Sequence, residues 1–357
     1  MFNGIKNIIV LTKIFLVTDS LKTNGWGEFA SSTAKILAKN NNFRVFIISK
    51  TSHNRNFSKN IKVLRLFNNI FIDALLINTY NFLFKPKVVH FCSEKVFGIC
   101  KFYNHKKIIL TIHGTYGFLF KKRYSRLIEK ISVVTYDSRF TEERFKSLFK
   151  EKKSYLVYPL SNFYIENEEN EFVKKKRKYI LFIGNSKKRK GLNLVLKSFE
   201  KISKKFNNVK LALVGNFSDE HKKVIRNKPL IEIYCGISND KLIDLISSSI
   251  VNVLPSINAQ IENQLHFEGF GLVHIESNIF GTPTIGTNEC GNTDIIKNNF
   301  NGFLINQNNV NELSKSLYKI IDRHNKDDYS LNNNSIQIKN TFNSIDFNKK
   351  IINAYGI

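Results

Sequence analysis

Short apolar runs alternate with polar and amphipathic segments from the beginning of the sequence. Lys13–Thr18 and Arg44–Ser49 are mostly apolar and have the length of a buried strand. Between them, the apolar residues Phe29, Ala34 and Leu37 belong to a helical pattern. A strand, a helix and a second strand within 37 residues predict a βαβ unit, whose strands are parallel.

The same alternation continues in two regions of the chain. In the first region, further apolar runs predict strands at Val88–Phe91, Ile108–Ile112 and Ser132–Thr135. In the second region, Leu192–Phe206 has the pattern of a helix. The predicted strands of that region are Tyr179–Gly184, Val209–Gly215, Ile231–Tyr234, Val251–Leu254 and Thr284–Ile285. The sequence therefore predicts an α/β fold with two doubly wound, Rossmann-like domains.

The two alternating regions are separated by residues 165–178, where an acidic run precedes a basic run. Such a segment is typical of a solvated connector. We expect a first domain in residues 1–164, a second in residues 179–340, and a helix in residues 341–357 that packs back on the first domain. Because ligands bind beyond the carboxyl ends of parallel strands, we expect the two domains to face each other across a cleft.

Two longer apolar stretches are not suited to crossing a membrane. Ile5–Val17 is too short and is interrupted by Lys6 and Lys13, and Phe67–Phe84 contains Asp73 and several asparagines. No small-residue cleavage site follows the first stretch. We expect a cytoplasmic protein that can associate peripherally with the inner face of a membrane.

Charge is the most unusual feature of the composition. The net charge is +26, and residues 1–150 hold 26 basic residues against 8 acidic ones. Such an excess attracts polyanions, which include nucleic acids, anionic lipids and phosphorylated substrates. Four cysteines occur singly, so neither a disulfide framework nor a zinc site is predicted.

The most informative segment pairs two carboxylates, Glu268 and Glu276, eight residues apart. Gly269 and Gly271 follow the first of them, and glycines allow a close approach of the backbone to a ligand. Leu272 marks a helix start. We therefore expect Glu268 in the loop before this helix and Glu276 about one turn into it.

This Glu-x7-Glu segment resembles the signature of the retaining nucleotide-sugar glycosyltransferases of family 4. Other landmarks in the same order extend the resemblance over nearly the whole chain. They are Gly184, Arg189-Lys190-Gly191, Pro255-Ser256, Gly281-Thr-Pro-Thr-Ile285 and Gly302. The resemblance implies the GT-B fold, in which two Rossmann-like domains hold a nucleotide-diphosphate sugar.

The resemblance also implies roles for residues of the second domain. Glu268 would bind hydroxyls of the donor sugar, and Glu276 would bind both ribose hydroxyls. Arg189 and Lys190 would stabilise the departing diphosphate. The family usually has an arginine directly after the strand's glycine, where this chain has Asn185, so Arg189 would act from the loop instead. The other donor-binding residues implied are Gly184, Asn185, Gly269, Phe270, Gly271 and Leu272.

In the first domain, Gly25-Trp26-Gly27 lies between the first strand and its helix, where backbone N–H groups can face an anion. The resemblance places this loop at the donor phosphates and the acceptor. His113, in Thr-Ile-His-Gly, matches a family histidine that contacts the donor sugar near the reacting carbon.

No metal and no cofactor are expected, with the nucleotide-diphosphate sugar as co-substrate. The sequence lacks an Asp-x-Asp pair, which other glycosyltransferases use to hold a divalent ion on the diphosphate. The resemblance implies a UDP-, GDP- or ADP-sugar donor. The acceptor would be a glycan or a lipid-linked sugar in cell-envelope or polysaccharide synthesis.

A basic amphipathic segment follows His113. Its apolar residues have helical spacing, and cations fill the positions between them, which favours a helix on the first domain that also attracts anionic lipid. The apolar residues are Phe120, Tyr124, Leu127, Ile128 and Ile131.

Two alternatives stay open from the sequence. The first is a nucleic-acid-binding protein, suggested by the net charge alone, although no recognised nucleic-acid module is present and no nucleic acid is expected as partner. The second is an enzyme of the same fold that epimerises a sugar nucleotide.

Overall fold

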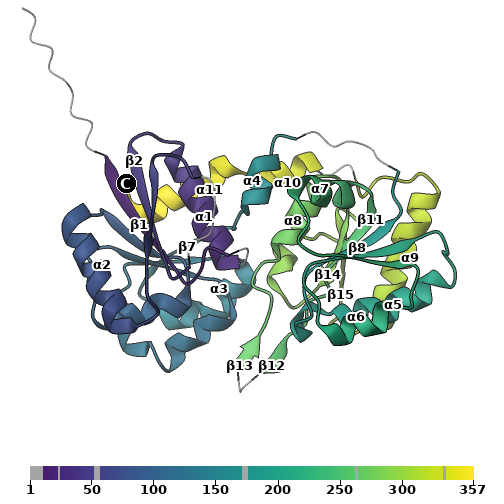
Figure 1. The fold of residues 1–357 in the computed structure, drawn as a ribbon, viewed down its shortest axis with the longest axis horizontal. Coiled ribbons are helices and arrows are strands. Elements are labelled where there is room, and N and C mark those ends of the chain that lie inside the picture. Colours follow the sequence, from purple (N-terminus) through teal and green to yellow (C-terminus); the bar gives the residue numbers. More distant parts are fainter. Residues whose placement is uncertain (1–10, 23–24, 52–56, 171–175, 262–263, 333–334) are drawn as a thin grey trace, which may run out of the picture. The chain divides into compact units, whose positions relative to one another are not determined.

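The computed structural model describes residues 11–22, 25–51, 57–170, 176–261, 264–332 and 335–357. The chain divides into two compact units, each with its own parallel sheet (Figure 1). Unit 1 comprises Met1–Tyr136, Phe145–Asn162 and Ser344–Ile357, and unit 2 comprises Asp137–Arg144 and Phe163–Asn343.

The sheet of unit 1 has seven parallel strands in the order β3-β2-β1-β4-β5-β6-β7. The strands are β1 Thr12–Thr18, β2 Phe43–Ser49, β3 Ile61–Arg65, β4 Val88–Phe91, β5 Ile108–Ile112, β6 Val133–Tyr136 and β7 Lys153–Leu156. The central strands are almost completely buried, as continuous apolar runs in a parallel sheet require. The order reverses between β1 and β4, and this switch point is where ligands bind in doubly wound sheets.

Helices α1 (Gly25–Ala38), α2 (Ile70–Phe84) and α11 (Ser344–Tyr355) belong to unit 1. α3 (Arg139–Phe145) and α4 (Asn162–Asn167) lie where the chain passes between the units. The predicted connector 165–178 is therefore helical in its first three residues, and residues 171–175 are outside the described part.

α11 returns the end of the chain to unit 1, where it lies beside α1 (Figure 1). Tyr355 Oη lies 2.8 Å from His90 Nδ1, and His90 Nε2 lies 2.6 Å from Thr111 Oγ1. Thr111 is hydrogen-bonded to Thr135 in turn. All four side chains are buried, so this network joins α11 to β4, β5 and β6.

Unit 2 has a six-stranded parallel sheet in the order β10-β9-β8-β11-β14-β15. Its strands are β8 Tyr179–Ile183, β9 Lys210–Val214, β10 Ile231–Tyr234, β11 Ser249–Val253, β14 Thr284–Thr287 and β15 Gly302–Ile305. A separate antiparallel hairpin is formed by β12 (Ala259–Ile261) and β13 (Gln264–His266), within the stretch that follows Pro255-Ser256.

Helices of unit 2 pack on this sheet around a core that includes Phe182, Leu213 and Val253. They are α5 Leu192–Ser203, α6 Asp219–Ile225, α7 Asn239–Ser247, α8 Leu272–Asn278, α9 Val310–Asn325 and α10 Ser335–Thr341. The strand order reverses between β8 and β11, which makes the carboxyl ends of these two strands the switch point of unit 2.

The prediction of one helix over Phe120–Ile131 is wrong. The structure has two short 3₁₀ helices there, Thr115–Lys121 and Ser125–Lys130. The apolar positions Phe120, Tyr124, Leu127 and Ile131 are nevertheless buried, while most of the cations between them are exposed.

Candidate functional site

The segments that follow β8 and β11 meet at the switch point of unit 2. After β8 the chain forms a short 3₁₀ turn, Lys188–Lys190, and then enters α5. After β11 comes Pro255-Ser256, and Ile257 N–H donates to the carbonyl of Arg189 at 2.7 Å. This hydrogen bond joins the turn Lys188–Lys190, called the basic turn below, to the loop that leads towards Glu268.

Glu268 is the centre of the group. Its Oε2 accepts from Arg189 Nη1 at 2.5 Å and from Lys190 Nζ at 2.6 Å, and Ser256 Oγ lies 3.3 Å away. The side chains of Glu268 and Lys190 are only 13% and 15% exposed. The sequence therefore predicted three residues that the structure places in direct contact.

Gly191 allows this arrangement, because it sits between Lys190 and α5 with a φ of 73°. A Cβ at this position would lie 2.2 Å from the carbonyl oxygen of Pro255. A left-handed backbone and this close approach both require glycine. The backbone geometry therefore explains why the third residue of the Arg189-Lys190-Gly191 motif is a glycine.

The electrostatics of Glu268 follow from its neighbours. Burial alone would raise the pKa of its carboxyl, but Arg189 and Lys190 outweigh burial and hold the pKa well below its usual range. Burial lowers the pKa of the Lys190 ammonium, and Glu268 opposes that effect. Glu268 is therefore ionised at neutral pH, with two basic side chains on one of its oxygens.

The glycine-rich turn leads from Glu268 into α8. Gly271 has a φ of 94° and precedes the first helical residue, Leu272. Phe270 is buried, and its ring packs on Phe342 at 5.9 Å, so its side chain belongs to the core and only its backbone is available to a ligand. Glu276 lies on α8 as expected and is 9% exposed.

Gly269 and Gly184 both lie where chains approach closely. A Cβ at Gly291 would be 1.6 Å from the Gly269 carbonyl oxygen, and Gly291 N–H donates to the carbonyl of Glu268 at 3.0 Å. Gly184 follows β8, and its N–H donates to Val214. The Asn185 side chain accepts from Lys187 N–H at 3.0 Å, which shapes the start of the basic turn.

His274 is a residue of this site that the sequence did not single out. It is completely buried on α8, and its Cδ2 is the atom that a Cβ at Gly271 would meet at 2.8 Å. Burial lowers its pKa to about 3, so the ring is neutral at physiological pH. Nε2 lies 3.5 Å from Asn292 Nδ2, while Nδ1 and Asn292 Oδ1 have no hydrogen-bond partner within the described part of the chain. A histidine within an apolar helix gives no signal of this in the sequence.

The site residues predicted in the first domain lie in unit 1. His113 follows β5, and its backbone N–H donates to Glu94 Oε1 at 2.8 Å. Its Nε2 lies 3.1 Å from the Cys92 carbonyl oxygen. The other oxygen of Glu94 accepts from Trp26 Nε1 at 3.1 Å, and Lys95 lies over the Trp26 ring at 4.6 Å. His113 therefore lies at the carboxyl end of β5, the strand next to β4, and the buried Glu94 carboxylate accepts from its backbone N–H.

Gly25 and Gly27 differ from the prediction, because α1 already begins at Gly25. They form the first turn of this helix rather than a loop before it. A Cβ at Gly27 would lie 2.2 Å from the carbonyl oxygen of Lys22, so the chain before the helix folds closely over this turn. No group of three or more His, Cys, Asp or Glu side chains among the described residues could hold a metal ion.

Comparison with known proteins relates the region that contains this site to a protein family. Residues 164–337 match the family of glycosyl transferases group 1. The matched region is a group 1 glycosyl transferase domain. It contains Arg189, Lys190, Glu268 and Glu276, all of which lie in unit 2.

Relatives of the chain include two bacterial proteins. An uncharacterized glycosyltransferase of Haemophilus influenzae is 30% identical over 225 residues, covering 60% of each chain. The capsular polysaccharide biosynthesis glycosyltransferase CapM of Staphylococcus aureus is 25% identical over 169 residues, covering 46% of this chain and 42% of CapM. The chain thus spans less than two thirds of these relatives.

Solved structures resemble the chain in fold over nearly its whole length. Sucrose-phosphate synthase from Thermosynechococcus elongatus has a TM-score of 0.77 at 16% identity, covering 96% of this chain and 98% of its own. Anabaena HepE, solved in complex with UDP and glucose, has a TM-score of 0.73 at 12% identity, covering 97% and 99%. The fold is that of the GT-B glycosyltransferases, as the sequence predicted.

Proposed function

We propose that the chain is a retaining glycosyltransferase that moves a hexose-type sugar from a nucleotide-diphosphate sugar to a glycan or lipid-linked acceptor. The observation that carries this proposal is the ion group at the switch point of unit 2. There Arg189 and Lys190 hold Glu268 beside the turn that leads into α8.

Arg189 and Lys190 are suited to the diphosphate of the donor. Negative charge grows on the departing nucleoside diphosphate as the glycosidic bond breaks, and two fixed cations stabilise that charge. Both side chains are at least three-quarters buried, so water screens them little. Because they supply the positive charge, we expect transfer without a bound metal.

Glu268 and Glu276 are assigned to hydroxyl groups of the donor. A carboxylate that stays ionised accepts hydrogen bonds from sugar hydroxyls, and the low pKa of Glu268 keeps it ionised. Glu276, on α8, is assigned to both ribose hydroxyls, so it contributes to nucleotide binding. Gly269 and Gly271 let the backbone approach the donor between them.

We assign the acceptor to unit 1, with His113 near the reacting carbon of the donor. In the proposed reaction the acceptor oxygen bonds to the anomeric carbon on the face that the leaving group occupied. The bond from that carbon to the phosphate oxygen breaks, and the departing phosphate takes the acceptor's proton. The protein contributes position and charge rather than a covalent intermediate.

Two relatives narrow the expected substrates. HepE was solved with UDP and glucose, and CapM is named for capsular polysaccharide biosynthesis. We therefore place a UDP-sugar first among the donors to be tested, ahead of GDP- and ADP-sugars, and an oligosaccharide or lipid-linked precursor first among the acceptors. Such chemistry would take place in the cytoplasm, where nucleotide sugars are made.

Nucleotide binding by Lys190→Ala tests the donor site. Loss of a charged hydrogen bond of about 1.5–3 kcal/mol should weaken nucleoside-diphosphate binding roughly 10- to 100-fold by isothermal titration calorimetry. Binding of the corresponding nucleoside should not change, because it lacks the diphosphate. Lys188→Ala is the matched control, since Lys188 is exposed in the same turn.

Equal loss of nucleoside and nucleoside-diphosphate binding in Lys190→Ala would argue against a phosphate role. Two further measurements address the reaction itself. Activity should persist in excess EDTA, and NMR of the product should show the anomeric configuration of the donor. Release of nucleoside diphosphate only when an acceptor is present would distinguish transfer from epimerisation.

A further inference from the structure

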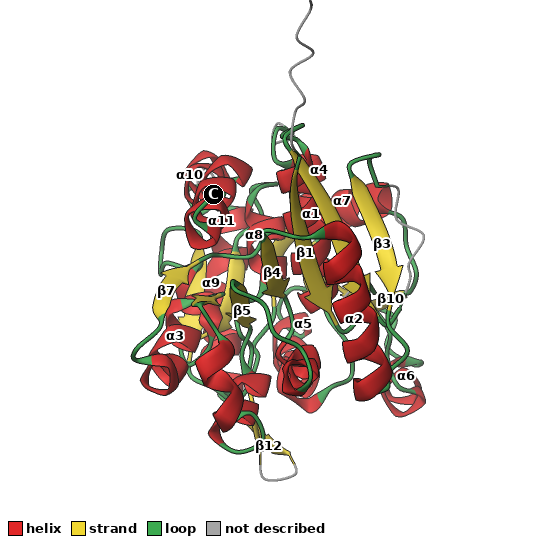
Figure 2. Cartoon of the chain, turned by 90° about the vertical axis from the view of Figure 1, so that its left-hand side faces the viewer, coloured by secondary structure: helices red, strands yellow, loops and turns green. Residues whose placement is uncertain are grey.

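α2 lies on the outside of unit 1 (Figure 2), and most of the large side chains on its outer face are apolar and exposed, with the exposed polar residues Asn78 and Thr79 between them. Phe71, Leu75 and Phe82 are 64%, 68% and 75% exposed. They recur at helical spacing, and Ile72 and Leu83 extend the same face. A helix that covers a sheet normally has a polar outer face, so this one lacks the expected amphipathicity.

α2 has almost no charge of its own. Its single charged residue, Asp73, is buried and accepts from Phe67 N–H at 2.7 Å. The inward side packs on the sheet of unit 1 through Phe84, whose ring lies 4.5 Å from that of Phe46. The helix is therefore held by its inner side, and on its outer side Phe71 packs on Phe102.

Two exposed aromatic residues enlarge this face. Phe67, just before α2, is 61% exposed, and Phe102 is 49% exposed with its ring 4.7 Å from that of Phe71. We call the whole set the α2 apolar surface. It comprises Phe67, Phe71, Ile72, Leu75, Phe82, Leu83 and Phe102. A contiguous apolar patch of this kind usually marks an interaction site.

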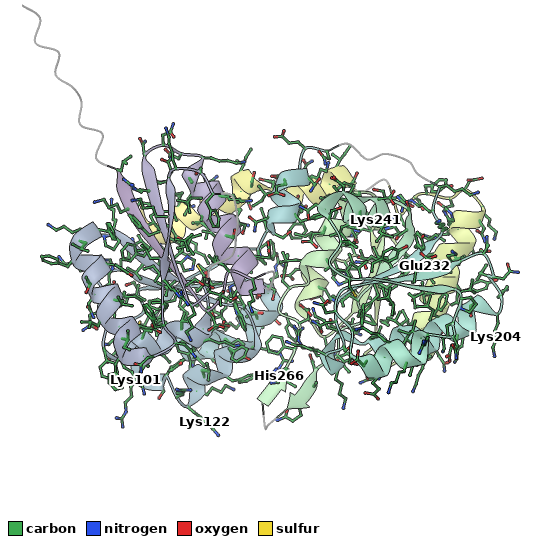
Figure 3. The ribbon with its side chains drawn as sticks, viewed as in Figure 1. Lys101, Lys122, Lys204, Glu232, Lys241 and His266 are labelled. Carbon is green, nitrogen blue, oxygen red and sulfur yellow. The ribbon has the colours of Figure 1, made fainter. Side chains whose placement is uncertain are left out.

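The surroundings of the surface are cationic. Between residues 57 and 93 the sequence has five lysines and arginines, and all five side chains are exposed. The only acidic residue in that range is Asp73, which is buried. Those cations are Lys59, Lys62, Arg65, Lys85 and Lys87. Lys101 precedes Phe102, and Figure 3 shows Lys101 and Lys122 along the same margin of unit 1. Phenylalanines and leucines rimmed by lysines match an anionic lipid surface in both chemistry and charge.

We propose that unit 1 binds an anionic lipid bilayer through the α2 apolar surface, with α2 lying in the plane of the interface. At 15 residues, α2 is about 22 Å long, shorter than the roughly 30 Å hydrocarbon core. No helix among the described residues is both long and apolar enough to cross a membrane. Insertion of the phenylalanines to the depth of the head groups therefore fits the length of the helix.

This proposal replaces the membrane contact predicted at Phe120–Ile131. The apolar side chains Phe120, Tyr124 and Leu127 are buried in unit 1, so they cannot enter a bilayer. The proposal does not rest on the transfer reaction, although a lipid-linked acceptor would be reached from such a surface.

Vesicle flotation of the full chain tests the proposal. The wild type should float with phosphatidylcholine vesicles that contain about one-third phosphatidylglycerol. The triple variant Phe71→Ser, Leu75→Ser, Phe82→Ser should bind these vesicles at least about tenfold more weakly. Ile345→Ser is the matched control, because Ile345 is 81% exposed on α11 and lies outside the surface. Its binding should equal that of the wild type.

The charge requirement is tested separately with Lys85→Gln, Lys87→Gln. Each removed charge should weaken binding to the anionic vesicles about fivefold. Binding should also fall as the ionic strength rises from about 0.1 M to about 1 M, where the Debye length shrinks from about 10 Å to about 3 Å.

Three results would overturn the proposal. The first is vesicle binding by the triple variant that is as strong as that of the wild type. The second is equally strong binding of the wild type to vesicles of pure phosphatidylcholine. The third is a wild-type dimer that the triple variant does not form, together with no binding to vesicles. The last result would assign the surface to a second copy of the chain. The circular dichroism spectrum and the urea unfolding midpoint of each variant are the control for folding. If the wild type binds vesicles but no nucleotide, the proposed function is contradicted, whereas the lipid-binding proposal is not.

Discussion

At the scale of single residues, one carboxylate oxygen of Glu268 satisfies two cations that would otherwise repel each other. Arg189 and Lys190 are adjacent in sequence and share that oxygen at 2.5 and 2.6 Å. Breaking such a pair by removing one partner costs more than the pair contributes, because charge is left poorly solvated. Glu268 therefore supports the fold of the basic turn as well as the proposed donor site.

Glu268→Gln should be less stable than the wild type by roughly 1–3 kcal/mol at pH 7, as measured by urea unfolding. The sign follows from the pKa. Because the folded pKa lies below the unfolded value of about 4.3, ionised Glu268 stabilises the fold above that pH and loses this effect as the pH falls. The difference between the two proteins should shrink at about pH 3. A difference that is the same at both pH values would contradict the ion group.

His274 predicts a loss of stability in the same direction as Glu268, but already in mild acid. Its folded pKa of about 3 lies below the unfolded value of about 6.5, so unfolding takes up a proton between these values. Stability conferred by the neutral ring is complete above about pH 6.5 and falls as the pH decreases towards about 3.

In His274→Gln, the slope of unfolding free energy against pH should be about 1.4 kcal/mol per pH unit shallower between about pH 6 and pH 4. Chemical unfolding at several pH values measures that slope. His105→Gln serves as a comparison, since His105 is a partly buried histidine of unit 1. An unchanged slope in His274→Gln would mean that the ring is charged in the folded protein.

At the scale of elements, the sequence predicted most of the strands well. β4, β5 and β10 have the predicted bounds, because each is a short apolar run between polar segments. The edge strands β3 and β7 were missed, since their residues are largely exposed and their sequences lack an apolar run. β15 and the hairpin β12–β13 were missed too, and the hairpin's strands have only three residues each.

The sequence predicted only those residues of the site that belong to a linear motif. Glu268, Arg189 and Lys190 were named together because the family order of landmarks placed them, and the structure brings them into contact. Trp26 and Glu94 around His113 depend on three strands ending at one sheet edge, which no local pattern encodes. Donor and acceptor roles for all these residues stay predictions.

The C-terminal helix α11 gives a prediction at this scale. Tyr355→Phe removes the hydroxyl that bonds His90 and leaves a buried ring nitrogen without its partner. We expect a loss of about 1–3 kcal/mol in unfolding free energy, with nucleotide binding unchanged because the proposed donor site lies in unit 2. Tyr318→Phe is a suitable control, since its hydroxyl bonds an exposed lysine. Equal stability of Tyr355→Phe and wild type would mean that water or another group replaces the hydroxyl.

At the scale of the whole molecule, the net charge of +26 decides how the protein meets polyanions. Non-specific binding to nucleic acid is expected at low salt, because phosphate contacts release counterions. In a gel shift at about 0.15 M ionic strength, we expect a Kd weaker than roughly 1 µM for duplex DNA and for RNA of random sequence. A tight, sequence-dependent complex under those conditions would instead favour the nucleic-acid-binding alternative.

The bond between His90 and Tyr355 spans 265 positions along the chain. A ribosome that adds about 5–20 residues per second needs roughly 15–50 s to translate that interval. During this delay all of unit 2 emerges, whereas the buried imidazole of His90 still lacks its phenol partner. Nascent unit 1 is therefore incomplete for longer than unit 2, and its unfinished interior is the part of the newborn protein that chaperones would have to shield.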